Sequence, residues 1–198
     1  VLPVLEGLKS VDVPVSVDTT KPEVMLAAIS AGASMINDVN ALLAPGAVET
    51  VVASGAALCL MHKQGEPKTM QINPQYQDVL AEVADFLKAR VEAMEAVGVA
   101  RERICIDPGI GFGKNLEHNL ALLRNIGRLK AIGVPVLIGV SRKSLLGKIS
   151  GLEVYDRVQV SAVAAVLAVK QGAAIVRVHD VKATKDALAV YNAVGREA

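Results

Sequence analysis

The chain has 198 residues and a formal net charge of +1, and its acidic and basic residues are interspersed. This length can bury a sizeable core in one or two domains. The balanced charge lacks the basic surface on which nucleic-acid binding depends, so we expect no nucleic-acid partner. No apolar run reaches the roughly 18 residues that span a bilayer, and no signal peptide is recognisable. We therefore expect a cytoplasmic protein that does not bind a membrane.

The predicted interior is aliphatic, because 52% of the residues are hydrophobic but only 3% are aromatic. Ala, Val, Leu and Ile in such proportions suit architectures in which helices pack on parallel strands. Cys59 and Cys105 lie in apolar runs without CxxC or His-rich spacing. They are predicted to be buried, reduced thiols rather than metal ligands or a redox pair.

Short apolar segments alternate with helical patterns along the whole chain. Each apolar segment is rich in Val, Ile or Leu with little alternation, which is typical of strands buried on both faces. The predicted strands cover residues 13–17, 33–36, 57–61, 103–106, 135–140 and 174–178. The predicted helices cover residues 22–31, 45–54, 77–97, 116–132, 156–171 and 182–195.

This alternation with short loops predicts a parallel sheet with right-handed crossovers, either an open doubly wound sheet or a closed barrel. Polar residues follow all six predicted strands. An open sheet needs them only where the strand order reverses, whereas in a barrel all carboxyl ends meet at one mouth. We therefore predict an α/β fold, a (β/α)8 TIM barrel with about six of its eight units in this chain. Residues 1–198 are expected to form a single domain.

The first two strands end in acid and amide groups. Asp18, in VSVDTTKP, is either a site residue or a cap of the helix that starts at Pro22. Asn37 ends the second strand in INDV without a turn signal. Its amide can donate and accept hydrogen bonds, which suits the edge of an amide-like heterocycle.

The fourth strand is followed by a glycine-rich loop, DPGIGFGKN. Asp107 ends the strand, and the alternating glycines permit close approach of the backbone to a ligand. The spacing differs from the dinucleotide fingerprint, and a purely structural turn is the alternative. Phe112 lies among these glycines and is predicted to cover a planar ligand.

Cationic side chains follow the last two strands. In GVSRKS, Ser141 and Lys143 lie at the predicted start of a helix, which favours an anion or a carboxylate. In RVHD, Arg177 and His179 point to the same side of a strand, so both can hold a phosphate. The alternative is an internal ion pair of either residue with Asp180 or with an Asp of a neighbouring strand.

The third strand ends in CLMHKQG, a less specific pattern. The thioether of Met61 can pad the face of a flat ring. His62 is either part of the same site or a residue that forms hydrogen bonds within its loop.

Together, the motifs resemble those of the bacterial dihydropteroate synthases over the whole chain. The matching segments, in order, are VSVDTTKP, INDV, LMHKQG, DPGIGFGK, GVSRKS and RVHDV. The resemblance implies a pterin-binding barrel that works as a homodimer in folate biosynthesis. Members of this family, which is a sulfonamide target, are transferases. They join p-aminobenzoate to 6-hydroxymethyl-7,8-dihydropterin diphosphate and release diphosphate, with Mg²⁺ as the cofactor.

The resemblance also implies a role for each strand-end residue. The residues expected at the pterin are Asp18, Asn37, Met61, Asp107 and Lys143. Those expected at the diphosphate are Asn37, Arg177 and His179. Those expected at p-aminobenzoate are Ser141 at the carboxylate, and Phe112 and Lys143 beside the ring. The implied catalytic residues are Asp18, Asp107, Lys143, Arg177 and His179.

The sequence departs from the family pattern at its start. VLPVLEGLKS has no initiating Met and resembles the end of an amphipathic helix. The family stretches N-x-T-P-D-S-F-S-D and G-G-E-S-T-R-P-G do not occur. We expect that an N-terminal portion is missing, and with it the metal ligand that the resemblance places in the first stretch. No metal ligand is assigned to this chain, and its activity by itself is left open.

Other functions fit part of this pattern. A pterin-binding methyltransferase domain shares the barrel and the pterin contacts, but it needs neither the Arg177–His179 pair nor Lys143. An inactive pterin-binding fragment is a second alternative. An unrelated phosphate-binding barrel would leave Asp18, Asn37 and Asp107 without a shared purpose.

Overall fold

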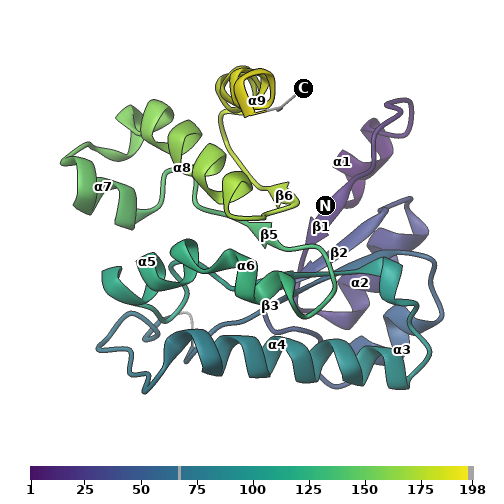
Figure 1. Ribbon diagram of the computed structural model, residues 1–198. Coiled ribbons are helices and arrows are strands. Elements are labelled where there is room, and N and C mark those ends of the chain that lie inside the picture. The colour runs from purple at the N-terminus through teal and green to yellow at the C-terminus, as the bar shows by residue number, and fades with distance from the viewer. Residues whose placement is uncertain (67, 196–198) are drawn as a thin grey trace.

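The computed structural model describes residues 1–66 and 68–195, in which strands and helices alternate (Figure 1). The strands are β1 (Ser16–Asp18), β2 (Met35–Asp38), β3 (Ala57–Met61), β4 (Ile104–Asp107), β5 (Leu137–Ile138) and β6 (Ile175–Val176). The helices are α1 (Leu2–Gly7), α2 (Pro22–Ser30), α3 (Ala47–Val52), α4 (Val79–Ala96), α5 (Leu116–Arg124), α6 (Ile126–Lys130), α7 (Ser144–Ser150), α8 (Val158–Lys170) and α9 (Val181–Gly195). None of the described helices is long and apolar enough to cross a bilayer.

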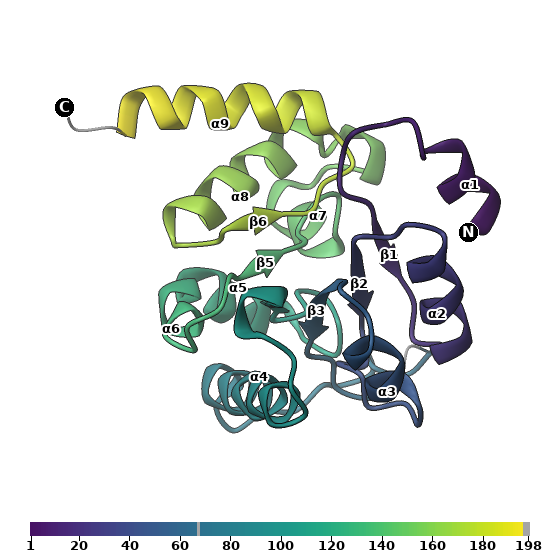
Figure 2. The same cartoon turned by 90° about the vertical axis from the view of Figure 1, so that its right-hand side faces the viewer.

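The strands are parallel and follow one another in space in the order of the sequence. β1 to β4 form one sheet, and β5 pairs with β6. A parallel bridge between Ile106 and Val136 joins the two parts, with the Ile106 amide donating to the Pro135 carbonyl at 2.9 Å. This order, without a reversal, is that of a barrel wall and differs from a doubly wound sheet. The described strands form an open arc, with helices such as α2, α4 and α8 outside it (Figure 2).

The core lies between these strands and the surrounding helices, and its side chains are aliphatic as the composition predicted. Met25 of α2, Leu87 of α4 and Ile106 of β4 are fully buried members of one apolar cluster. Cys59 and Cys105 are also buried and are free thiols, which confirms their predicted state. They lie opposite each other in the register of β3 and β4.

The element boundaries differ from the sequence prediction in several places, of which three change an element. The predicted strand at residues 13–17 begins only at Ser16, and Val13 is exposed outside the sheet. The predicted helix at residues 116–132 is two helices, because Asn125 leaves the helical conformation with φ −123°. The segment after Lys143, for which only a helix start was predicted, forms the short helix α7.

Candidate functional site

The carboxyl ends of the first, second and last described strands are joined by hydrogen bonds. Asp18 and Asn37 lie opposite each other in the register of β1 and β2. Asn37 donates from Nδ2 to Asp18 Oδ2 at 2.9 Å, and Arg177 donates from Nη1 to the same oxygen at 2.8 Å. Arg177 and Asp18 are 159 positions apart, so the curved sheet brings them together. Arg177 therefore forms an ion pair with Asp18 of β1, at the opposite end of the open arc, rather than with Asp180 or with an Asp of an adjacent strand.

Asp18 does not cap the helix that follows it. The residue before α2 is Lys21, which has no side-chain capping bond, and its amide donates to Thr19 Oγ1 at 3.2 Å. The acid that does organise a turn is Asp38, which is buried and accepts the amides of Asn40 and Leu42, both at 2.8 Å. Within the described residues the side chain of Asp18 thus bonds Asn37 and Arg177 at the mouth instead of capping α2.

Asp107 is a deeply buried acid at the end of β4. It is 1% exposed, and its Oδ1 accepts the Gly109 amide at 2.7 Å. Burial raises the pKa of its carboxyl above the usual range, although Lys143 and the Gly109 amide act in the opposite direction. Its Oδ2, like Oδ1 of Asn37, is buried without a hydrogen-bond partner within the described part of the chain. Buried polar atoms are normally paired, so two such acceptors in one site indicate a missing donor.

Lys143 reaches the same region from the β5–α7 connection. Its Nζ lies 4.7 Å from the centre of the Phe112 ring, a cation–π distance, and donates to the Ile110 carbonyl. Burial lowers the pKa of the ammonium to about 8, opposed by the nearby charge of Asp107. The structure therefore brings Phe112, Lys143 and Asp107 together as the sequence predicted.

Ser141 and His179 are held to each other. Ser141 is buried, and its Oγ lies 3.0 Å from His179 Nδ1 and 3.2 Å from the His179 amide. Ser144, the first residue of α7, is exposed instead. Ser141 was the residue predicted to meet a carboxylate at the helix start. The exposed hydroxyl at the start of α7 belongs to Ser144, three residues further along the chain.

A cavity of about 300 Å³ opens in front of these groups. It is lined by Gly139, Ser141, Lys143, Arg177, Val178 and His179. A Cβ at position 139 would come within 3.4 Å of Arg177 Nε, so the glycine leaves room for the guanidinium. The lining combines three cationic or ionisable side chains, which suits an anionic group.

The glycine-rich loop is held by a lysine that sequence reasoning missed. Lys114 is 2% exposed, and its Nζ lies 3.1 Å from the carbonyl oxygens of Gly109 and Phe112 and 3.0 Å from His62 Nδ1. Burial lowers the pKa of this ammonium to about 7. The sequence signal that could have indicated this role is the position of the lysine at the end of a glycine-rich loop, where backbone carbonyl oxygens converge.

The glycines permit this loop to approach the β3–α4 connection. Gly109 and Gly113 have φ of +68° and +65°, a region that favours glycine. A Cβ at either position would collide with the carbonyl oxygen of His62 or Gln64 respectively. Part of the motif is therefore structural, because at these two glycines the backbone approaches another segment of the protein.

Met61 and His62 have separate surroundings. Met61 is fully buried and lies opposite Asp107 in the register of β3 and β4. His62 accepts from Lys114, and its ring meets Phe86 edge-on at 5.1 Å. Burial, and then the charge of Lys114, lowers the pKa of His62 to about 3, so the ring is neutral at pH 7. His62 is thus a hydrogen-bonding residue of its loop.

The chain matches known proteins over almost its full length. The family described as pterin binding enzyme matches residues 1–179. The dihydropteroate synthase of Neisseria meningitidis serogroup B is 51% identical over 199 residues, which cover 98% of this chain and 70% of that protein. The crystal structure of dihydropteroate synthase from Stenotrophomonas maltophilia has a TM-score of 0.97 and 48% identity, covering 100% of this chain and 76% of that one. The crystal structure of Burkholderia cenocepacia dihydropteroate synthase complexed with 7,8-dihydropteroate has a TM-score of 0.92 and 50% identity. The match covers 98% of this chain and 72% of that one. The chain therefore belongs to the dihydropteroate synthase family, whose solved structures have the fold predicted from the sequence.

Proposed function

We propose that this protein is a dihydropteroate synthase, a transferase of folate biosynthesis. It would join p-aminobenzoate to 6-hydroxymethyl-7,8-dihydropterin diphosphate and release diphosphate. One observation supports this most directly. The same mouth holds two buried acceptor atoms, on Asn37 and Asp107, that have no partner among residues 1–66 and 68–195, beside a cavity lined by Lys143, Arg177 and His179.

The buried half of the mouth suits the pterin ring. A 2-amino-4-oxo heterocycle presents N–H donors along one edge, and carboxylate and amide oxygens accept them. Asp107 Oδ2 and Asn37 Oδ1 are available for this, because their other polar atoms are already bonded to Gly109 and Asp18. We propose that these two residues, with Asp18, bind that edge, and that Met61 lines the pocket beneath.

The open half suits the two anionic groups. We propose that Arg177 and His179 bind the diphosphate, with Asn37 beside them. Lys143 and Phe112, which are in cation–π contact with each other, would both lie beside the aminobenzoate ring. Ser141 is bonded to His179, so we propose that it orients the imidazole, and that the exposed start of α7 at Ser144 lies nearer the aminobenzoate carboxylate.

The reaction follows from this arrangement without a covalent enzyme intermediate. An arylamine is a weak nucleophile, so the bond from the pterin methylene carbon to the diphosphate oxygen breaks ahead of attack. Asp18 and Asp107 stabilise the positive charge that develops on the pterin, and Arg177 and His179 stabilise the departing diphosphate. The amine nitrogen then bonds to the methylene carbon and releases its proton to solvent.

The alternatives explain less of the site. A methyltransferase domain would bind a pterin in the same half of the mouth but would have no use for Arg177, His179 and Lys143 around one cavity. An inactive fragment would keep the pterin contacts and lose turnover, which the assay below distinguishes.

A magnesium ion is part of this proposal only through the diphosphate. Within residues 1–66 and 68–195, no group of three or more His, Cys, Asp or Glu side chains could hold a metal. These residues do not form a metal site by themselves. Mg²⁺ is commonly bound by substrate phosphates with one or two protein ligands, so we propose that it accompanies the diphosphate. Calorimetric titration of the protein with the pterin diphosphate, in Mg²⁺ with and without EDTA, checks this, and weaker binding in EDTA is expected.

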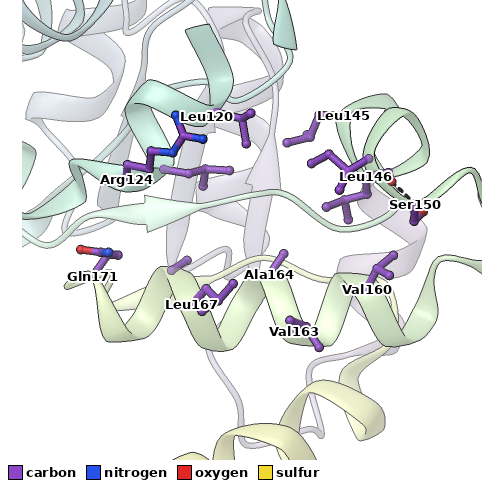
Figure 3. A pocket seen from close by; sticks show the side chains of 13 residues that line it. Leu120, Arg124, Leu145, Leu146, Ser150, Val160, Val163, Ala164, Leu167 and Gln171 are labelled. Atoms are coloured by element: carbon purple, nitrogen blue, oxygen red, sulfur yellow. Dashed lines mark hydrogen bonds between the residues drawn. The ribbon is translucent and has the colours of Figure 1, made fainter. Parts of the chain in front are cut away.

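We further propose a cytoplasmic homodimer. An apolar groove of about 420 Å³ lies between α5, α7 and α8, with Leu120, Leu145 and Val160 among its lining side chains (Figure 3). Along its edge Val163 and Leu167 of α8 are more than half exposed. Such a surface on two copies can be covered by symmetric packing of α8. Light scattering of Leu167→Asp, compared with the unaltered protein, checks this assignment, and an unchanged mass would contradict it.

Release of diphosphate from the pterin substrate, measured with and without p-aminobenzoate, tests the proposed reaction. Release that depends on p-aminobenzoate and yields a dihydropteroate by mass spectrometry is expected. Binding of the pterin without any turnover would favour the inactive fragment.

A further inference from the structure

Two neighbouring dipeptides at the mouth bind each other residue by residue. Ser141 and Arg142 follow β5, and His179 and Asp180 follow β6. Ser141 Oγ contacts His179 Nδ1 at 3.0 Å. Arg142 donates to Asp180 from Nε to Oδ2 at 2.9 Å and from Nη2 to Oδ1 at 2.5 Å. This two-bond ion pair has no role in the reaction proposed above.

Arg142 is a fixed anchor. It has φ +57°, a conformation that a residue with a side chain adopts at a cost and keeps only when its surroundings hold it. Its amide donates to Ser161 Oγ at 2.9 Å, and its carbonyl accepts Arg157 Nη1 at 3.0 Å. Lys143, the next residue, is therefore positioned by the backbone of Arg142 and does not depend on the guanidinium.

The partner side of the ion pair has fewer supports. Asp180 directly precedes α9, and its carbonyl accepts the amide and hydroxyl of Thr184 at 3.1 and 3.0 Å. Its carboxylate is directed to Arg142, which lowers the pKa of that carboxyl. His179 itself is exposed. In addition to Ser141 and the packing of α9 on α8, the bond to Arg142 thus holds this turn against the segment after β5.

Neither member of the ion pair is among the described residues that line the cavity, whereas Ser141 and His179 are. The residues assigned to the pterin ring lie on other strands: Asp18 on β1, Asn37 on β2 and Asp107 on β4. Their hydrogen bonds do not involve Arg142 or Asp180. Loss of the ion pair would therefore weaken the contacts to the diphosphate end of the substrate and leave those to the pterin ring unchanged.

We propose that Arg142 and Asp180 are positioning residues that hold His179 in place for the diphosphate of the pterin substrate. The pair acts through His179 and touches no substrate. The proposal rests on the function proposed above and adds a specificity element to it. The ion pair would distinguish a pterin that carries diphosphate from one that does not.

Asp180→Asn and Arg142→Lys test this in the full protein. Asn can still precede a helix, but it loses the charge, and Lys keeps the charge but loses the two-bond geometry. The matched control is Glu95→Gln, which weakens an equally close pair, because Arg101 Nη1 lies 2.8 and 2.7 Å from the Glu95 oxygens away from the mouth. Calorimetry would measure binding of 6-hydroxymethyl-7,8-dihydropterin diphosphate and of the same pterin without diphosphate.

Both mouth variants are expected to weaken binding of the diphosphate-bearing pterin by roughly tenfold, a loss typical of a displaced contact group. Binding of the diphosphate-free pterin is expected to change less than twofold, as is binding of either ligand by the control. The exchange Arg142→Asp with Asp180→Arg is expected to restore part of the loss, since Asp tolerates positive φ.

An equal loss for both pterins would assign the pair to general stability and overturn the proposal, and so would no loss for either. Should Asp180→Asn fail to fold, Arg142→Lys carries the same test. Turnover of the unaltered protein is measured first. If it does not release diphosphate, the proposed function fails. If the unaltered protein turns over normally but the Arg142 and Asp180 variants bind both pterins as it does, only the positioning role is overturned.

Discussion

The two halves of the mouth differ in how their polar groups are held. On the β2–β4 side, Asn37, Asp107 and Lys114 are each no more than 3% exposed. On the β6–β1 side, the Arg177 and Asp18 side chains are 41% and 47% exposed. Charges in the first half are expensive to bury and must be fixed by specific bonds, whereas those in the second are hydrated and screened. A rigid ring fits the first environment, and an anion that must depart fits the second.

The largest expected effect comes from Asp107→Asn in the buried half. Asn keeps the bond to the Gly109 amide but cannot stabilise positive charge, so kcat/KM should fall roughly 100-fold or more. Because burial raises the pKa of Asp107, the ionised carboxyl costs stability at pH values above that pKa, and removing it should not lower Tm at pH 7. Steady-state kinetics and thermal unfolding check both, with the exposed Asp85→Asn as control. Matching losses of Tm and activity would contradict this account.

Arg177→Ala probes the open half. Loss of its charge-assisted bonds to diphosphate should cost about 2 kcal/mol, a factor of roughly 30 in turnover. Its ion pair with Asp18 is exposed, so the free energy of unfolding should change by less than about 1 kcal/mol. Denaturant unfolding alongside the activity assay measures both quantities. A large loss of stability with little loss of turnover would favour the internal ion-pair role for Arg177.

Lys114→Met tests whether the buried half depends on its lysine. The substitution leaves the partly buried Phe112 carbonyl without its donor and the Gly109 carbonyl with the Phe112 amide alone, at a cost of about 1–3 kcal/mol of stability. We expect a lower Tm and an approximately tenfold loss of kcat/KM for p-aminobenzoate as Phe112 shifts. The exposed Lys148→Met is the matched control. An unchanged Tm would show that the loop is held by other contacts.

The smallest expected effect is a pH dependence of kcat/KM that arises from Lys143, which lies between the buried and the open half of the mouth. The pKa of Lys143 is lowered to about 8, so its charge is lost as the pH rises through that value. The kcat/KM for p-aminobenzoate, which reports groups of the free enzyme, should fall by about half at pH 8 relative to pH 6.5 and further above it. Lys143→Arg keeps its charge and should remove the part of the decline that is centred near pH 8, whereas a change centred near pH 7 would report Lys114. The same decline in the variant would assign it to another group.

Much of the fold could be predicted because helices and buried strands leave local patterns. The strand at Ala57–Met61 matches its predicted range, and the polar ends of β1, β2 and β6 are joined at one mouth. The break at Asn125 could not be predicted, because the helical pattern continues on both sides of it. The short β5 and β6 also differ from their longer predicted ranges, since pairing depends on neighbouring strands.

The positions of the candidate residues at the mouth were more predictable than the hydrogen bonds that they form. Asp107, Lys143 and Arg177 gather at the mouth as their strand-end positions indicated. Lys114 was missed because a lysine after glycines is ordinarily a solvated residue, and its burial follows from the fold around it. Ser141 was assigned to a carboxylate, but its hydroxyl faces His179, 38 positions away.

The sequence by itself determined the alternation of strands and helices, the aliphatic core and the polar residues at each strand end. These properties depend on neighbours within a few residues, where the periods of helix and strand act. Only the tertiary structure decided which polar groups bind each other: Asp18 with Arg177, Ser141 with His179, and Arg142 with Asp180. These partners are 38 to 159 positions apart. Their pairing follows from the curvature of the sheet, which no local pattern specifies.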